Sequence, residues 1–264
     1  MSHEIKQLSE FTDFENIFRN KFITALIFDF DKTVIENDSY QILYELLSGQ
    51  DGEELYQQFL IDQKEMKFID AHRKFENGVI DLLRSKGLAT RENVTNITKY
   101  FVLREGVDQV ISLAKQELGM RVIIISAGIS IIRKFVEDKL PDVDKVYTNT
   151  EFFYEPVDNG GQVYKMHQYS DFSKYKVEQL IDATKLYNFK LSDAMIMGDS
   201  GYDTDMVQAV QNEGGIGIAV ATNNIELRSV AMAEIESFNE LLEYLTLYKN
   251  YLRSRELLPR RRVS

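Results

Sequence analysis

Two aspartates stand one residue apart at the end of a short apolar run. The chain reads ALIFDFDKT from residue 25, so that Asp29 and Asp31 follow four apolar residues and Thr33 comes two positions later. A carboxylate can act as a nucleophile, and a second carboxylate nearby can donate and accept the proton that the reaction moves. The pair therefore marks a candidate catalytic site, although Asp31 and Thr33 alone are also typical of a turn.

Two further apolar runs end in polar residues in the same way. The run MRVIIIS ends at Ser126, which Ala127 and Gly128 follow, and the run DAMIMGD ends at Asp199, with Asp203 four residues later. Ser126 and Asp203 alone suit the N-caps of following helices. In a parallel α/β sheet, however, ligands bind beyond the carboxyl ends of the strands. Three strands that end in acid, hydroxyl and acid therefore predict one shared site.

A lysine and a metal ion complete the expected site. Lys176 lies 23 residues before Asp199, near the start of the preceding predicted helix, and alone it is typical of a solvated surface lysine. Clustered carboxylates repel one another unless a cation neutralises them. Hard divalent ions prefer oxygen ligands, and we therefore expect Mg²⁺ among these acids.

Apolar runs that alternate with helical patterns predict the elements that position these residues. The apolar runs suit strands covered on both faces, and they span residues 22–29, 120–126, 193–199 and 215–221. Patterns of helical period lie around and between them, at residues 7–20, 106–118, 128–139, 173–187, 203–212 and 223–231. This alternation predicts an α/β fold with a doubly wound parallel sheet.

The interval between the first two strands is too long for one crossover helix. Residues 38–104 read as helices with few glycines and no proline, so we expect an inserted helical cap domain there, with residues 1–37 and 105–264 forming the core domain. Residues 147–166 hold two β-prone runs around turn residues, which predicts a hairpin. From Tyr248 the basic tail is expected to be frayed and solvated, with a docking or anionic-surface contact as the alternative.

The composition of the 264 residues, 44% apolar and 28% charged, is ordinary for a globular protein. A net charge of −11 argues against broad nucleic-acid binding, although a metal or local cations could still hold an anionic substrate. There is no cysteine, which excludes disulfides and thiolate chemistry and agrees with a reducing compartment. The N-terminus does not resemble a signal peptide, and no apolar run approaches the length of a membrane span. We expect a cytoplasmic protein with no membrane or nucleic-acid partner.

The ordered motifs resemble those of the haloacid dehalogenase superfamily. DFDKT resembles its first motif, Asp-x-Asp-x-Thr, and IIIS resembles its second. Lys176 stands where the third-motif lysine belongs, and GDSGYD resembles the fourth. The motifs cover residues 25–205, and an insert between the first two is similar to the helical-cap branch that includes phosphoserine phosphatase. The resemblance implies a Mg²⁺-dependent phosphomonoester hydrolase that acts on a small phosphorylated metabolite through an aspartyl-phosphate.

The same resemblance implies a role for each motif residue. Asp29 corresponds to the nucleophile and Asp31 to the general acid and base. The groups expected to hold the phosphate are Ser126, Ala127, Gly128 and Lys176. The groups expected to hold Mg²⁺ are Asp29, Asp31, Asp199 and Asp203, the last as a ligand or as a support for the ligands.

Substrate selection is less readable. Asp38 falls where phosphoserine phosphatases place an acid that receives the substrate amine, and Phe68 and Arg73 match insert positions near their site. Phe75, however, stands where that family has a carboxylate-binding arginine, and Tyr202 replaces an asparagine usual in its fourth motif. Both departures count against phosphoserine as the substrate. Asp38 is also well placed to cap the following helix.

Two other function classes remain as alternatives. An Asp-x-Asp pair also occurs in metal-dependent glycosyltransferases, but that class does not explain Lys176 or GDSGYD. A non-catalytic phosphate-binding protein of the same fold would need neither Asp29 nor Asp31, and both are present. Phosphate release from p-nitrophenyl phosphate distinguishes these classes from a phosphatase.

Overall fold

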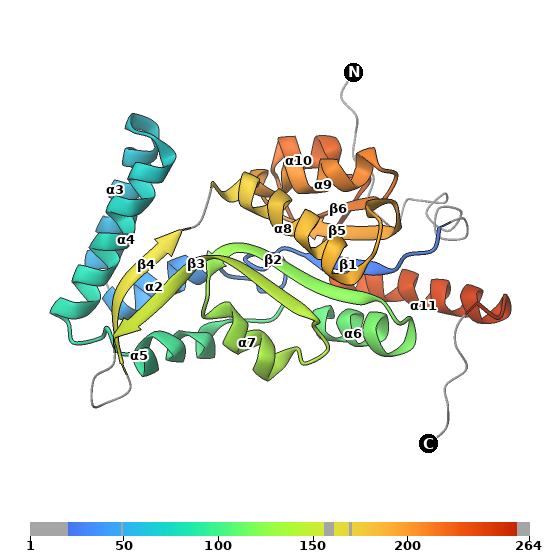
Figure 1. Cartoon of the computed structure of the whole chain (residues 1–264), viewed down its shortest axis with the longest axis horizontal. Helices are drawn as coiled ribbons and strands as arrows, with labels where there is room; N and C mark the ends of the chain where they lie inside the picture. Colours follow the sequence, from blue (N-terminus) through green and yellow to red (C-terminus); the bar gives the residue numbers. More distant parts are fainter. Residues whose placement is uncertain (1–20, 49, 156–160, 169–170, 258–264) are drawn as a thin grey trace.

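The computed structural model describes residues 21–48, 50–155, 161–168 and 171–257 of the chain. Within these residues a seven-stranded sheet runs in the order β4-β3-β2-β1-β5-β6-β7 (Figure 1). Neighbouring strands are parallel except for the antiparallel pair β3 and β4. The strands are β1 Ala25–Phe28, β2 Arg121–Ile129, β3 Lys145–Glu155, β4 Gln162–Gln168, β5 Ala194–Gly198, β6 Ile216–Val220 and β7 Ala233–Ile235. The expected doubly wound α/β fold is confirmed, with β4 added at one edge.

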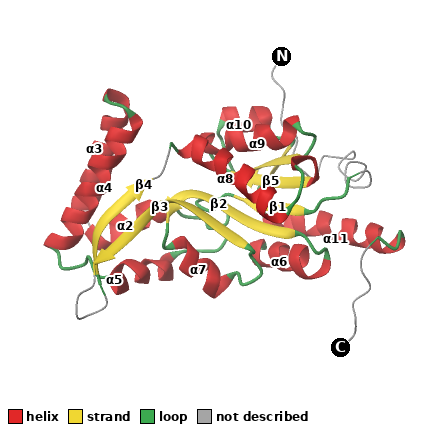
Figure 2. Cartoon of the chain, in the orientation of Figure 1, coloured by secondary structure: helices red, strands yellow, loops and turns green. Residues whose placement is uncertain are grey.

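Helices cover both faces of this sheet (Figure 2). One face carries α8 Phe172–Tyr187, α9 Thr204–Asn212 and α10 Ile225–Val230, and the other carries α6 Val107–Ser112, α7 Ile132–Lys139 and α11 Phe238–Ser254. Leu26 and Phe28 of β1 join the core on the side of α6 and α11, while Ala25 and Ile27 join the core on the side of α8 and α9. Because both faces are covered, β1 reads as a continuous apolar run.

Among the described residues, five α-helices lie between β1 and β2, and we call the first four of them the helical insert. These four are α2 Ser39–Ser48, α3 Gln50–Glu65, α4 Phe68–Ser85 and α5 Arg91–Asn96. The expected hairpin is confirmed as β3 and β4, and β4 lies against α4 (Figure 1). The Val163 N–H donates to the Ala89 carbonyl at 2.7 Å, and the Arg91 N–H donates to the Gly161 carbonyl at 3.1 Å. The division into core and cap domains stays a prediction.

The C-terminal part of the chain is more ordered than the sequence suggests. The expectation of a frayed tail from Tyr248 is wrong as far as Ser254, because α11 continues to that residue. The buried Tyr248 hydroxyl accepts the Ile23 N–H at 3.0 Å and donates to the Lys21 carbonyl at 3.0 Å. These two hydrogen bonds fasten α11 to the segment that leads into β1.

Three expectations fall on residues that the structure does not describe. They are the helix over residues 7–20, the turn Asp158–Gly160 and the tail beyond residue 257. Among the described residues, every helix is too short or too polar to cross a bilayer. The cytoplasmic location stays a prediction.

Candidate active site

The carboxylates of Asp29 and Asp199 come together because β1 and β5 are parallel neighbours. Phe28, the last residue of β1, pairs with Met197 of β5, and the Asp29 N–H donates to the Met197 carbonyl at 2.9 Å. Asp29 and Asp199 each follow the last residue of their strand, so both leave the sheet at its carboxyl edge. β2 and β3 lie on one side of this pair of strands and β6 and β7 on the other, which is the switch point where doubly wound sheets bind ligands.

Lys176 joins Asp29 to Asp203. Its Nζ lies 2.6 Å from Oδ1 of Asp29 and 2.5 Å from Oδ1 of Asp203, and all three side chains are at most 4% exposed. The lysine comes from the first half of α8, whereas Asp203 precedes α9. Lys176 is therefore a buried partner of two carboxylates, and its reading as a solvated surface residue is wrong.

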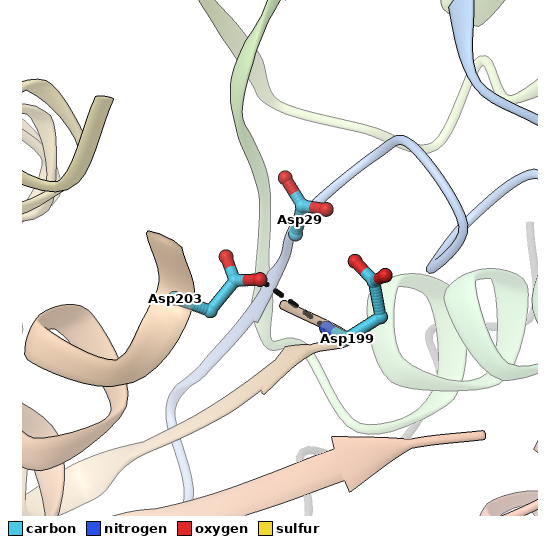
Figure 3. A group of neighbouring side chains, drawn as sticks. All are labelled: Asp29, Asp199 and Asp203. Carbon is cyan, nitrogen blue, oxygen red and sulfur yellow. Dashed lines mark hydrogen bonds between the residues drawn. The ribbon is translucent and has the colours of Figure 1, made fainter. Parts of the chain in front are cut away.

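Asp203 is held in place by donors on both of its oxygens. Its Oδ2 accepts the Asp199 N–H at 3.2 Å (Figure 3). The same oxygen accepts the Ser200 N–H at 3.0 Å and the Ser200 hydroxyl at 2.8 Å. Gly198 leaves the necessary room, because a Cβ there would lie 2.4 Å from Cγ of Asp203. With Lys176 on its other oxygen, Asp203 is better placed to orient its neighbours than to bind an ion directly.

The three carboxylates form a group that suits a divalent cation. Asp29, Asp199 and Asp203 each offer an oxygen, and these oxygens lie within 4.8 Å of one another (Figure 3). Burial, followed by the charges of Asp29 and Asp203, raises the pKa of Asp199 to about 9. Burial also raises the pKa of Asp29 to about 6, although Lys176 opposes this shift. If all three carboxyls are ionised, the single ammonium of Lys176 leaves the group with a net charge of −2, which a bound Mg²⁺ would neutralise.

Asp31 lies in the same cavity but is held by the start of the helical insert. Its Oδ1 accepts the Ser39 N–H at 2.7 Å and its Oδ2 accepts the Ser39 hydroxyl at 3.1 Å. Burial raises the pKa of Asp31 well above its usual range, and the charges of Asp38 and Asp29 raise it further. A carboxyl that keeps its proton near neutral pH can donate that proton to a leaving group.

The turn after Asp31 is strained. Lys32 adopts a φ of +56°, in the left-handed region that residues other than glycine and asparagine rarely occupy. Such strain is typical of functional sites, where the surrounding structure maintains it. Here it redirects the chain between Asp31 and Thr33, whose hydroxyl points to Oδ1 of Asp199 at 3.4 Å.

The end of β2 differs from the expectation. We expected the strand to end at Ser126 and a helix to begin at residue 128, but β2 continues to Ile129 and α7 begins at Ile132. The long strand β3 continues to pair with β2, and the register shifts between Ser126 and Ile129, which indicates a bulge. Ala127 and Gly128 are thus presented to the site by a bulged strand instead of a helix N-terminus.

Gly128 fits this bulge because it has no side chain. A Cβ at Gly128 would lie 2.6 Å from Oδ2 of Asp31 and 2.9 Å from Oγ of Ser126. Its N–H donates to the Ser126 hydroxyl at 2.9 Å, so this N–H is already in use. The buried Ser126 hydroxyl accepts that bond and keeps its own proton to donate.

A cavity of about 220 Å³ lies over these groups. It is lined by Asp29, Asp31, Lys32, Asp38, Tyr40, Tyr56, Ala127, Gly128, Phe172, Lys176, Asp199, Ser200 and Tyr202. Most of the expected residues therefore border one space, while the buried Ser126 and Asp203 are not among the residues that line it. Sequence reasoning missed Lys32, Tyr40, Tyr56 and Phe172 as lining residues. Lys32 stands inside the first motif, and Phe172 is four residues before Lys176, so proximity to a motif could have identified these two.

Of the three residues expected to select the substrate, one lines the cavity, one does not, and the side chain of the third is not described. Asp38 lines the cavity and also caps α2, because its Oδ1 accepts the N–H groups of Tyr40 at 3.0 Å and Gln41 at 3.2 Å. Arg73 is exposed on α4 and is not among the residues that line the cavity. The side chain of Phe68 lies outside what the structure describes.

Comparison with solved structures finds the same fold. A substrate-bound phosphoserine phosphatase is similar with a TM-score of 0.64 and 22% identity, and the match covers 85% of this chain and 99% of that one. A probable phosphoserine phosphatase from Vibrio cholerae has a TM-score of 0.65 and 16% identity, and the match covers 98% of this chain and 70% of that one. A haloacid dehalogenase family hydrolase from Salmonella enterica serovar Typhi has a TM-score of 0.67 and 18% identity, and the match covers 85% of this chain and 71% of that one. At these identities the likeness shows a common fold.

Comparison of the sequence itself identifies the family. No curated protein matches the chain. The model of the haloacid dehalogenase-like hydrolases matches residues 26–208, which is well over half of the chain and includes all four motifs. The expected superfamily is confirmed, as is the similarity in fold to phosphoserine phosphatase. The chain belongs to the haloacid dehalogenase-like hydrolase family.

Proposed function

We propose that the protein is a Mg²⁺-dependent phosphomonoester hydrolase that forms an aspartyl-phosphate on Asp29. The observation that carries the proposal is the position of the Asp29 carboxylate. It borders the cavity, its Oδ1 is paired with Lys176 at 2.6 Å, and Asp199 stands beside it. Two of the structural relatives described above are named as phosphoserine phosphatases, which supports the same class of reaction.

The first step is attack of Asp29 on phosphorus. A bond forms between a carboxylate oxygen of Asp29 and phosphorus, and the bond from phosphorus to the leaving oxygen breaks. Asp31, whose pKa is raised by burial, gives its proton to that oxygen. Lys176 and the Ser126 hydroxyl are fixed donors for the charge that develops on the phosphoryl oxygens.

The second step returns the enzyme to its starting state. Asp31, now ionised, takes a proton from a water molecule as that water attacks the phosphorus of the aspartyl-phosphate. Inorganic phosphate leaves, and the Asp29 carboxylate is regenerated. The ion would be held by Asp29 and Asp199, with the Asp31 carbonyl as a further ligand, and Asp203 would keep Asp199 and Lys176 in position. When bound, Mg²⁺ would neutralise charge on the phosphoryl oxygens.

The proposal is tested with the variant Asp29→Asn and a matched control. Release of phosphate from p-nitrophenyl phosphate and acetyl phosphate should need Mg²⁺ and stop in excess EDTA. Asp29→Asn should lower kcat by more than roughly 1000-fold. Asp205→Asn removes an exposed carboxylate two residues after Asp203 and should change little. Normal turnover by Asp29→Asn, or in EDTA, would contradict the mechanism.

The role of Asp31 has its own test. Asp31→Asn should lower kcat by roughly 100-fold or more for an alkyl phosphate, whose leaving group needs a proton. The loss should be smaller for p-nitrophenyl phosphate, because p-nitrophenolate leaves without protonation. An equal loss of kcat for both substrates would count against the acid role.

The aspartyl-phosphate can be detected directly. Acid-quenched enzyme given ³²P-labelled substrate should carry label on Asp29 that hydroxylamine removes.

A further inference from the structure

The cavity extends beyond the phosphate-binding groups into a region lined by aromatic side chains. Tyr40 and Tyr56 come from α2 and α3 of the helical insert, whereas Phe172 begins α8 and Tyr202 lies in the turn before α9. Two distant parts of the chain thus contribute an aromatic pair each to the same space. We call these four residues the aromatic lining. Nothing in the hydrolysis of phosphate itself requires such side chains.

The aromatic lining is held in place before any substrate arrives. The ring of Tyr56 stacks on Tyr44, with centroids 4.9 Å apart and planes inclined by 22°, and Tyr44 is 1% exposed. The Tyr40 hydroxyl donates a hydrogen bond to Oγ1 of Thr150 at 2.5 Å. Fixed side chains lose little conformational freedom on binding, so more of the contact free energy is available for affinity.

On the core side, the rings of Phe172 and Tyr202 meet edge to face at 5.1 Å. Both rings line the cavity, and that of Tyr202 is 41% exposed. Together they give this wall an apolar surface that suits an apolar group.

The polar residues at this end of the cavity already have partners. Asp38 uses Oδ1 to cap α2, and its Oδ2 lies 3.5 Å from Nζ of Lys32. A substrate ammonium would compete with Lys32 for the carboxylate of Asp38. Among the described residues that line the cavity there is no arginine, and Lys176 lies beside Asp29 and Asp203, where it is the proposed donor to the phosphoryl group. The amino and carboxylate groups of an amino acid would therefore find poor partners here.

The size of the cavity limits the substrate. A cavity of about 150 Å³ holds one benzene molecule. The 220 Å³ of this cavity therefore has room for a phosphoryl group and about one six-membered ring. A nucleotide or a sugar bisphosphate would extend out of it.

We propose that the leaving group of this phosphatase carries a single planar aromatic ring, bound against the aromatic lining. Aromatic rings attract one another edge to face or offset, beyond the effect of the buried area. The proposal rests on the proposed function, because it concerns the substrate of that reaction. It differs from the amino-acid phosphate that the fold relatives suggest.

Matched phosphate esters test the proposal on the wild-type protein with Mg²⁺. Benzyl, cyclohexylmethyl and isobutyl phosphate release primary alcohols of similar acidity, so differences in kcat/KM report binding of the group beyond the phosphate. Benzyl phosphate should exceed isobutyl phosphate by roughly tenfold or more and should also exceed cyclohexylmethyl phosphate, which is not planar. O-phosphoserine and phosphocholine should be poorer than benzyl phosphate.

Single substitutions show which residues produce the preference for benzyl over isobutyl phosphate. Tyr56→Leu and Tyr202→Leu should each lower the ratio of kcat/KM for benzyl over isobutyl phosphate toward one. Tyr202 is 41% exposed, so its variant should fold even if Tyr56→Leu does not. Tyr100→Leu changes a tyrosine that is 54% exposed and outside the cavity lining, and it should keep the wild-type ratio.

The outcomes separate the substrate proposal from the proposed function. Turnover of acetyl phosphate with equal kcat/KM for benzyl and isobutyl phosphate would overturn the substrate proposal and leave the phosphatase assignment intact. So would a clear preference for O-phosphoserine, phosphocholine or the cyclohexylmethyl ester. Failure to hydrolyse any of these esters, acetyl phosphate included, would overturn both.

Discussion

The ammonium of Lys176 lies 2.6 Å from Oδ1 of Asp29, and both side chains are almost completely buried. This pair links the middle of the sheet to α8 across 147 residues of sequence. Burying two charges is favourable only where geometry and further hydrogen bonds compensate for lost solvation. The compensation comes from Asp203, which accepts a second hydrogen bond from the same ammonium at 2.5 Å. The acidic cluster of the candidate site is therefore also part of the core that holds α8 to β1.

The first prediction concerns the variant Lys176→Met. Removing the ammonium leaves Asp29 and Asp203 buried without their cation, which should lower the free energy of unfolding by about 3–5 kcal/mol. It should also lower kcat by roughly 100-fold or more, since a fixed donor to the phosphoryl group is lost. Lys174→Met removes a lysine whose side chain is 70% exposed two residues away, and urea unfolding of that control should match the wild type. Equal stability of the two variants would contradict the role of the buried pair.

The second prediction concerns Asp199 and the metal. When no metal is present, Asp199 has a folded-state pKa of about 9, above its unfolded value of 3.8. At neutral pH the unfolded state therefore loses a proton that the folded state keeps, and this difference favours unfolding. Asp199→Asn should therefore raise the Tm in EDTA. Mg²⁺ should stabilise the wild type, by about 2.7 kcal/mol at a hundred times its Kd, and should stabilise the variant much less. Thermal unfolding with and without Mg²⁺ measures both effects, with Asp205→Asn as the control.

A variant that is less stable than wild type in EDTA would contradict this account. It would mean that Asp199 supports the fold by itself, with no need for a cation. A Tm in EDTA that rises as much in Asp205→Asn as in Asp199→Asn would point to a general effect of removing negative charge near α9.

The sequence allowed the centre of the sheet to be predicted because its strands are buried on both faces. The strands β1, β2, β5 and β6 consist mostly of apolar residues, and each was expected within a few positions. β7 was not recognised, because it is only three residues long and has Glu234 at its centre. That glutamate is 3% exposed and pairs with Arg228 at 2.9 Å, a contact that no local pattern reveals.

In the candidate site, the acids at the strand ends were predictable from the sequence, but the aromatic lining was not. Residues such as Asp29 and Asp199 follow apolar strands, and the parallel order of those strands brings them together. The aromatic lining could not be derived in this way, because Tyr56 reaches the cavity only through the position of α3 relative to the core. Hydrophobic periodicity assigns a tyrosine to a helix face but does not say which other element that face meets.

The third prediction is a pH dependence of stability from Glu76. Burial raises the pKa of Glu76 to about 7, although the charges of Arg73 and Lys165 oppose the shift. Its Oε1 has no hydrogen-bond partner among the described residues. The folded state thus keeps a proton that the unfolded state loses near pH 4.5, so this residue lowers stability as the pH rises from about 4.5 to about 7. The loss should not exceed about 3 kcal/mol.

The variant Glu76→Gln removes this titration while keeping the shape of the side chain. It should be more stable than wild type at pH 8 and close to it at pH 4.5, as measured by urea unfolding across that range. Asp81→Asn, an exposed change on the same helix, should leave the wild-type dependence unaltered. A constant difference between Glu76→Gln and wild type at every pH would show that Glu76 is ionised in the folded state.

The last prediction separates the two contacts of Asp38. Its Oδ1 caps α2 through the N–H groups of Tyr40 and Gln41, and its Oδ2 faces Nζ of Lys32 at 3.5 Å. Asparagine caps a helix about as well as aspartate, so Asp38→Asn should keep stability, whereas Asp38→Ala should lower it by about 1 kcal/mol. Without the carboxylate, Lys32 becomes available to an anionic substrate group. KM for a phosphate ester with a carboxylate at its far end should then fall several-fold in Asp38→Asn, and KM for benzyl phosphate should hardly change. If both KM values stay as in wild type, Lys32 does not reach the substrate, and Asp38 acts only as the cap of α2.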